Sequence, residues 1–136
     1  MPKFIFDENI GSKVVKAIQA VLSFHKNKSE VKYIFDFYPS GVPDNEWIVG
    51  LDNDWIIITA DRARKYGGGK LPLICKEKSI SVILLSSSMH NQNQFYKVRA
   101  IIYLWDKFLE IDSKPRGTQF LLKYSNFRQP QLVEKK

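Results

Sequence analysis

The chain has 136 residues, of which 44% are hydrophobic and 13% aromatic, which is enough to build the core of one domain. This composition argues against a disordered chain, and the single cysteine excludes an internal disulfide. The 21 Lys and Arg residues outnumber the 14 Asp and Glu residues, and the net charge of +7 favours a polyanionic partner such as nucleic acid as much as it favours a surface of solvated lysines.

The N-terminal sequence and the hydropathy of the chain bear on its location. No apolar run approaches the roughly 20 residues that span a bilayer. The N-terminus reaches two acids after only three apolar residues, unlike a signal peptide. We therefore expect a soluble cytoplasmic protein that is not associated with a membrane.

Short apolar runs alternate with segments of helical periodicity, which is the pattern of an α/β domain with a mostly parallel sheet. Strands are predicted at residues 4–6, 32–37, 55–59 and 82–86. Helices are predicted at residues 10–22, from Pro43 and Asp44 onward, at 71–79 and at 91–109, where the longest helix is expected. The pattern breaks after residue 113, so residues 113–136 are expected to be a C-terminal extension that is partly extended or mobile.

Acidic residues follow three of these segments at the points where strands give way to helices. Asp7, with Glu8 beside it, follows the first strand; Asp44 opens a helix after the second; and Asp61 follows the third. Each acid alone is explained by helix capping. If the strands are adjacent, however, the acids converge at the edge of the sheet where ligands usually bind, and they repel one another unless a proton or a cation lies between them. Oxygen ligands of this kind suit Mg²⁺ or Mn²⁺.

Three cations come directly after Asp61 in the sequence. A metal ion held by the acids would activate a water molecule against a phosphodiester. Arg62, Arg64 and Lys65 would then bind the flanking phosphates, since arginine in particular makes paired contacts with phosphate oxygens. The alternative for these cations is a solvated helix face.

The segments FIFDEN, GVPDNEWI and WIIITADR resemble the PIN-like ribonucleases, and most closely the VapC-like toxins with a shortened PIN domain. The resemblance runs from about residue 3 to Leu109 and places the PIN-like domain at residues 1–112. It implies a three-layer Rossmann-like fold with a central, mostly parallel sheet. It also implies a metal-dependent endoribonuclease, often the toxin of a toxin–antitoxin pair. The expected partners are RNA and an antitoxin protein, and the chain could also form a homodimer.

The resemblance assigns the site residues by motif position. Asp7 matches the first family acid, Asp44 or Glu46 the second, and Asp61 the third; Glu8, which matches none of the family acids, is expected as a further metal ligand that ranks below Asp7. Where typical members carry a fourth acid, this chain has a run of three serines that begins at Ser86. Ser86 is assigned to substrate binding, and the number of metal ions stays open.

Two other functions remain compatible with the sequence. The missing fourth acid is also expected of a catalytically silent nucleic-acid-binding module that keeps the fold and the basic surface. Metal and carboxylates do not dictate substrate size, so a metal-dependent phosphatase acting on a small substrate is the second alternative.

Overall fold

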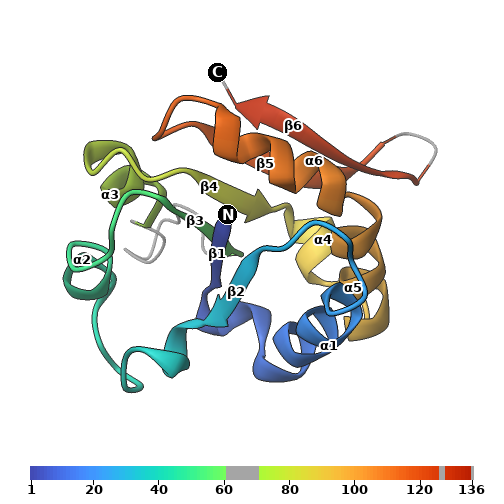
Figure 1. Cartoon of the computed structure of the whole chain (residues 1–136), viewed down its shortest axis with the longest axis horizontal. Helices are drawn as coiled ribbons and strands as arrows, with labels where there is room; N and C mark the ends of the chain where they lie inside the picture. Colours follow the sequence, from blue (N-terminus) through green and yellow to red (C-terminus); the bar gives the residue numbers. More distant parts are fainter. Residues whose placement is uncertain (61–70, 126–127, 136) are drawn as a thin grey trace.

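The strands form one sheet, which is shown in Figure 1. The computed structural model describes residues 1–60, 71–125 and 128–135, with Asp44 described by its backbone alone. Within these residues the strand order is β2-β1-β3-β4-β5-β6; the first five strands are parallel, and β6 is antiparallel to β5. The strands are β1 (Lys3–Phe6), β2 (Glu30–Tyr33), β3 (Trp55–Thr59), β4 (Val82–Leu85), β5 (Gln119–Tyr124) and β6 (Pro130–Lys135).

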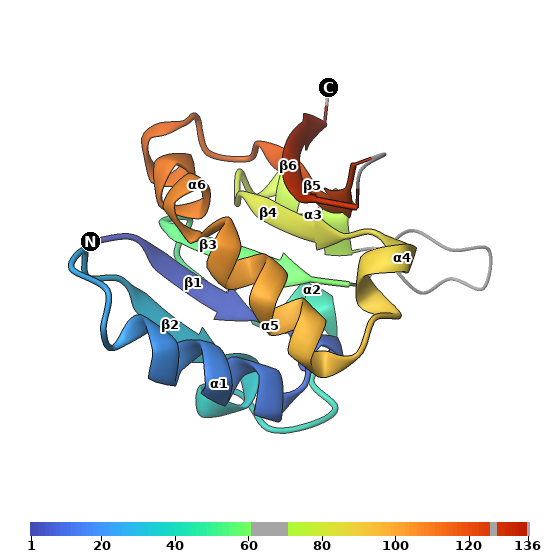
Figure 2. The same ribbon diagram turned by 90° about the vertical axis from the view of Figure 1, so that its right-hand side faces the viewer.

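Helices cover both faces of the sheet, so the fold has three layers (Figure 2). One face carries α1 (Ser12–Leu22), α5 (Gln94–Tyr103) and α6 (Trp105–Glu110). The opposite face carries α2 (Asp44–Trp47) and α3 (Leu71–Glu77). The remaining short elements are α4 (Ser87–His90) and the 3₁₀ turns η1 (Glu8–Ile10), η2 (Ile34–Asp36) and η3 (Ile111–Ser113). The predicted three-layer α/β fold with a mostly parallel sheet is confirmed. No helix in the described ranges has the length and apolar character needed to cross a membrane.

The pleat of the central strands divides the core into two clusters. In β1, Phe4 and Phe6 pack on the side of α1 and α5, whereas Ile5 packs on the side of α2 and α3. Strand β3 alternates in the same way. The ring of Phe4 lies 4.7 Å from that of Trp105, which fixes α6 against the first cluster. Because β1 and β3 are buried on both faces, the groups that follow them are held by a rigid support.

The predicted second strand at residues 32–37 is wrong in its bounds. Strand β2 ends at Tyr33, and the 3₁₀ turn η2 follows at once. The turn forms because the Asp36 carboxylate accepts a hydrogen bond from the Tyr33 backbone N–H at 2.9 Å. A side chain that bonds to the backbone of its own segment competes with the sheet, and the apolar composition does not reveal this competition.

The single helix predicted at residues 91–109 is also wrong. Two separate helices, α5 and α6, occupy most of this range. Asn93 caps the start of α5 by accepting a hydrogen bond from the Phe95 N–H at 2.9 Å, and Leu104 leaves the helical conformation between the two helices. With its 11 residues, α1 is longer than α5, which has 10.

The segment after residue 113 contributes two strands to the main sheet. Strand β5 pairs in parallel with β4, and β6 pairs with β5 along its whole length. Phe120 and Leu122 of β5 are buried in the same cluster as α1 and α5. The described part of this segment therefore packs on the same core as β1 to β4.

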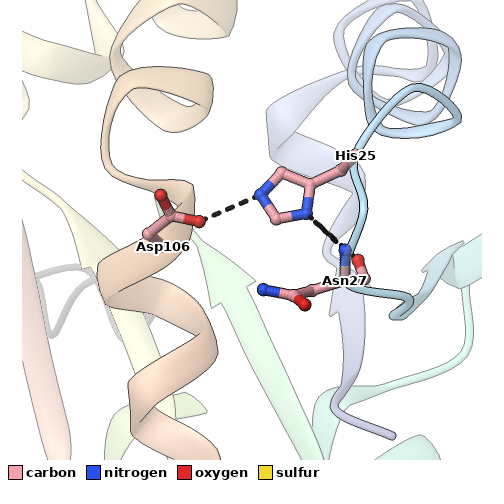
Figure 3. A network of polar contacts seen from close by, with 3 residues as sticks. All are labelled: His25, Asn27 and Asp106. Carbon is pink, nitrogen blue, oxygen red and sulfur yellow. Dashed lines mark hydrogen bonds and ion pairs between the residues drawn. The ribbon is translucent and has the colours of Figure 1, made fainter.

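A polar contact ties the loop after α1 to α6 (Figure 3). The Asn27 backbone N–H donates to His25 Nδ1 at 3.0 Å. Nε2 then donates to Asp106 Oδ1 at 2.9 Å. This contact lies where the chain enters β2, at the amino edge of the sheet, and is thus remote from the acids predicted at the carboxyl edge.

Candidate active site at the carboxyl edge of the sheet

The strand order changes direction between β1 and β3. The chain leaves β1 toward β2 on one side and returns to β3 on the other, so the two connections diverge at this point. In open parallel sheets, ligands bind at such a switch point, beyond the carboxyl ends of the strands. Figure 2 shows these ends of β1, β3 and β4 on the same side of the molecule. Asp7 and Thr59 stand at the ends of the two diverging strands.

Asp7 is a buried carboxylate that is held by hydrogen bonds at both oxygens. Only 4% of the residue is exposed. Oδ1 accepts from the Glu8 backbone N–H at 2.8 Å, which makes Asp7 the N-cap of η1, and Oδ2 accepts from the Thr59 hydroxyl at 2.8 Å. A buried charge is tolerated only with such partners. The carboxylate is thus fixed in position by groups from the turn after β1 and from the end of β3.

Asn9 extends this network across the switch point. Its side-chain oxygen accepts from the Ala60 backbone N–H at 3.0 Å and lies 3.4 Å from the Thr59 hydroxyl. The backbone N–H of Asp7 donates to the Ile58 carbonyl at 2.9 Å, so the β1–β3 ladder continues to the site. The turn after β1 and the end of β3 are therefore joined by side chains as well as by backbone.

The strand pleat places Asp7 and Thr59 on the face that α2 covers. Ile5 and Ile57 belong to the cluster beneath α2 and α3, and Asp7 and Thr59 each come two residues later in the extended chain. Helix α2 begins at Asp44 on this face, because its last residue and the one after it are buried in the same cluster. The backbone of Asp44 thus shares a face of the sheet with Asp7.

The pKa of Tyr33 is affected by the acids at this edge of the sheet. Its hydroxyl donates to the Glu8 carbonyl at 3.2 Å. Burial raises the pKa of Tyr33, and the negative charges of Glu8 and Asp7 raise it further. The phenol therefore stays protonated and keeps this hydrogen bond at neutral pH.

The structure also describes the side chains of three other predicted site residues, Glu8, Glu46 and Ser86. Glu8 is exposed, and only its backbone reaches Asp7; Glu46 is exposed on α2. Ser86 follows β4 and caps α4, since its hydroxyl accepts from the Met89 N–H at 3.1 Å and lies 3.1 Å from the Ser88 hydroxyl. The hydrogen bonds described above link Asp7 to Thr59 and, through the Thr59 hydroxyl, to Asn9.

Several predicted residues lie outside the described ranges. They are Asp61, Arg62, Arg64 and Lys65, and the side chain of Asp44 is not described either. Among the side chains that the structure does describe, no three His, Cys, Asp or Glu residues gather closely enough to hold a metal ion. The three-acid hypothesis therefore stays a prediction.

The donors around Asp7 fit a hard divalent cation. Asp7, Thr59 and Asn9 present a carboxylate, a hydroxyl and an amide oxygen at one point of the edge. Oxygen donors of this kind are the ligands that Mg²⁺ and Mn²⁺ take. The sequence analysis missed Thr59 and Asn9, although both stand in the quoted motifs. Two features of the sequence could have identified them: Thr59 is a polar residue at the end of an otherwise apolar strand, and Asn9 is an amide two residues after Asp7.

Removing the Thr59 hydroxyl tests how strongly it supports the Asp7 carboxylate. The isosteric change Thr59→Val is expected to lower the free energy of unfolding by about 1–3 kcal/mol, because a buried carboxylate loses a hydroxyl donor. Urea unfolding measures the change. The matched control is Thr118→Val, whose hydroxyl donates to a neutral carbonyl at the exposed surface and should cost about 1 kcal/mol or less. Equal losses for the two variants would contradict this role of Thr59.

The parallel sheet, its switch point and the buried acid at that point define a three-layer α/β fold of PIN type. Residues 2–86 match the family model described as a PIN like domain, which is more than half of the chain. The chain belongs to the PIN like domain family, which confirms the PIN-like part of the resemblance noted from its motifs. Comparisons with curated proteins and with solved structures give no match. PIN-like domains are generally nucleases and typically use divalent metal ions, so the chain is a nuclease-type module.

Proposed function

We propose that the protein is an endoribonuclease that depends on Mg²⁺ or Mn²⁺. One observation carries this proposal: a buried, doubly hydrogen-bonded Asp7 carboxylate at the switch point of a PIN-type sheet. A buried charge costs stability, and such charges gather where chemistry requires them. Asp7 follows β1, Asp61 comes two residues after the end of the neighbouring strand β3 in the sequence, and Asp44 begins the helix on the same face as Asp7, so we assign these three to the ion.

The remaining residues have assigned roles in this proposal. Glu46 is the alternative to Asp44 as the second family acid. Glu8 is an additional ligand, because its side chain is exposed and accessible to the ion. When bound, the ion lowers the pKa of a water molecule and offsets charge on the phosphodiester. Asp7 orients the site because its own carboxylate is held by Thr59 and by the Glu8 N–H.

The substrate would be held by the cations that follow β3. Arg62 and Arg64 would bind the phosphates that flank the cleaved bond, Lys65 would add a further positive charge, and the Ser86 hydroxyl would contact the strand from β4. The net charge of +7 supports a polyanionic substrate such as RNA.

The biological role that we propose is that of the toxin in a toxin–antitoxin pair. An antitoxin would then block the site, with an acidic or extended segment lying among the cations after Asp61. This role is inferred from the likeness to VapC-like toxins, and inspection of the neighbouring reading frame tests it. A homodimer is compatible with the same role and would appear in sedimentation velocity.

Metal dependence is the direct test of the proposed reaction. The wild type is expected to cleave single-stranded RNA with Mn²⁺ and to lose activity in EDTA, and Asp61→Asn is expected to be inactive with Mn²⁺ because one ligand charge is lost. The control is Asp52→Asn, which removes an exposed acid just before β3, at the opposite edge of the sheet. Gel analysis of a labelled RNA measures cleavage.

The other outcomes of this assay identify the alternatives. Cleavage that persists in EDTA or in Asp61→Asn would overturn the metal mechanism. Tight binding of RNA without any cleavage would indicate the catalytically silent module. Hydrolysis of small phosphomonoesters without any action on RNA would indicate a phosphatase.

A further inference from the structure

A pair of aromatic rings, the half-buried Tyr33 and the exposed Phe35, lies beside the candidate active site. The Tyr33 hydroxyl donates to the carbonyl of Glu8, the residue that follows Asp7. The ring of Phe35 lies 5.3 Å from that of Tyr33 and meets it edge to face, at 81°. Phe35 is 41% exposed although it is a large apolar residue. Strand β2 is the neighbour of β1, so the pair lies at the same carboxyl edge as Asp7.

The backbone around Phe35 is fixed at both ends. Phe35 is the middle residue of η2, and the buried Ile34 before it anchors this turn in the core. The Asp36 carboxylate accepts from the Tyr33 N–H at 2.9 Å, and the Phe37 N–H donates to the Ile34 carbonyl at 3.0 Å. Phe35 is therefore an exposed ring on a rigid turn, so its binding to a partner would cost little conformational entropy.

The position of Tyr33 limits what this ring can bind. The carbonyl that accepts from Tyr33 belongs to the residue after Asp7, so Phe35, which packs on Tyr33, lies at the same edge of the sheet as Asp7, within reach of a strand whose phosphate is bound there. In a nucleic acid, the group next to a backbone phosphate is a base. Aromatic side chains in such positions stack on unpaired bases, whereas the bases of a duplex are already stacked on each other.

We propose that Tyr33 and Phe35 form a base-stacking subsite for single-stranded nucleic acid, with Phe35 as the contact and Tyr33 as its support. The inference rests on the proposed function, because the stacked base would belong to the same RNA strand whose phosphodiester is cleaved at Asp7. The net charge of +7 of the whole chain suits a polyanionic substrate, whereas the charged groups nearest Tyr33 are the acids Glu8, Asp7 and Asp36, so the pair is expected to contribute base stacking and not phosphate binding. Purines stack more strongly than pyrimidines, so the subsite favours adenine over uracil.

Binding measurements without cleavage test this subsite. The probes are fluorescein-labelled octamers of adenosine, of uridine and of an abasic backbone with the same charge, and fluorescence anisotropy is measured in EDTA with a gel check that each probe stays intact. Phe35→Ala is expected to weaken adenosine-octamer binding about 5- to 100-fold, to reduce the preference over uridine, and to leave abasic binding unchanged. Phe35→Trp should retain binding.

The matched control is Phe24→Ala. Phe24 is 89% exposed, but it lies in the loop that leads to β2 at the amino edge, so its loss should change none of the three affinities. An equal loss for the adenosine and abasic octamers in Phe35→Ala would overturn the inference, because the ring would then support the fold and not a base. Unchanged binding, or an absence of binding in the wild type, would overturn it too. A change in self-association on sedimentation, with unchanged affinities, would identify a protein interface instead.

Failure of this inference and failure of the proposed function give different results. If the wild type does not cleave RNA but Phe35→Ala shows the base-dependent loss, the subsite stands and the reaction does not. If metal-dependent cleavage occurs and the Phe35 variants bind all three probes like the wild type, the reaction stands and the subsite does not.

Discussion

The variant Asp7→Asn is expected to lower metal-dependent RNA cleavage about 100-fold or more while the fold stays intact. In the proposed function Asp7 is the ligand of the ion that is held most firmly. Removing a residue that only supports a metal ligand typically lowers metal affinity about 10- to 100-fold, and removing the charge of the ligand itself is expected to cost at least as much. In the same proposal Asp7 contacts the reacting centre directly, so a large effect on cleavage is expected.

The local geometry explains why this variant should fold. An asparagine side chain can keep its oxygen toward the Glu8 N–H and turn its amide toward Thr59. The Thr59 hydroxyl can then accept instead of donate, since a hydroxyl serves in both roles. The carboxylate and the amide have nearly the same shape, so the buried site keeps its packing.

Parallel measurements separate the two effects. Cleavage is followed with Mn²⁺ in excess, metal affinity by isothermal titration calorimetry, and the free energy of unfolding by urea denaturation. Asp52→Asn serves again as the surface control. Full activity of Asp7→Asn would refute the role of Asp7, and a loss of stability that matches the loss of activity would assign Asp7 to the fold instead.

The second large effect concerns the C-terminal strands. Leu122→Ala is expected to lower the free energy of unfolding by about 2–5 kcal/mol, because a fully buried side chain of β5 is removed from the core that α1 and α5 share. Thermal unfolding followed by circular dichroism should still show one cooperative transition. The control Leu73→Ala removes a leucine of α3 that is 61% exposed and should change stability by less than about 1 kcal/mol.

This variant also tests where the domain ends. The sequence places a boundary after residue 112, and the family match ends at residue 86. If residues 113–136 form a separate extension, Leu122→Ala should leave the main transition unchanged. A shift of the whole transition would show that β5 folds together with β1 to β4.

The strands were predicted well where burial on both faces makes a continuous apolar run. Strand β3 coincides with the predicted residues 55–59, and β1 and β4 agree within one residue. Two of the errors in element bounds involve a polar side chain that bonds to the backbone of its own segment, whereas the break between α5 and α6 falls at the apolar Leu104. Asp36 ends β2 early and Asn93 starts a new helix, and neither bond can be read from the spacing of apolar residues.

The candidate site was predicted in part. Asp7 was expected at the carboxyl edge and lies there, buried and held. Its partners Thr59 and Asn9 were not expected as site residues, because their contribution depends on the pairing of β1 with β3. The position of Asp61 relative to Asp7 stays a prediction.

The sequence by itself determined the α/β class, the family and the acid that ends the first strand. These depend on local features, namely apolar runs, helical spacing and short motifs. Only the tertiary structure decided which side chains meet. The order of strands across the sheet places residue 59 beside residue 7 and residue 33 beside residue 8, and contacts between residues so distant in the chain follow from strand pairing and not from local sequence.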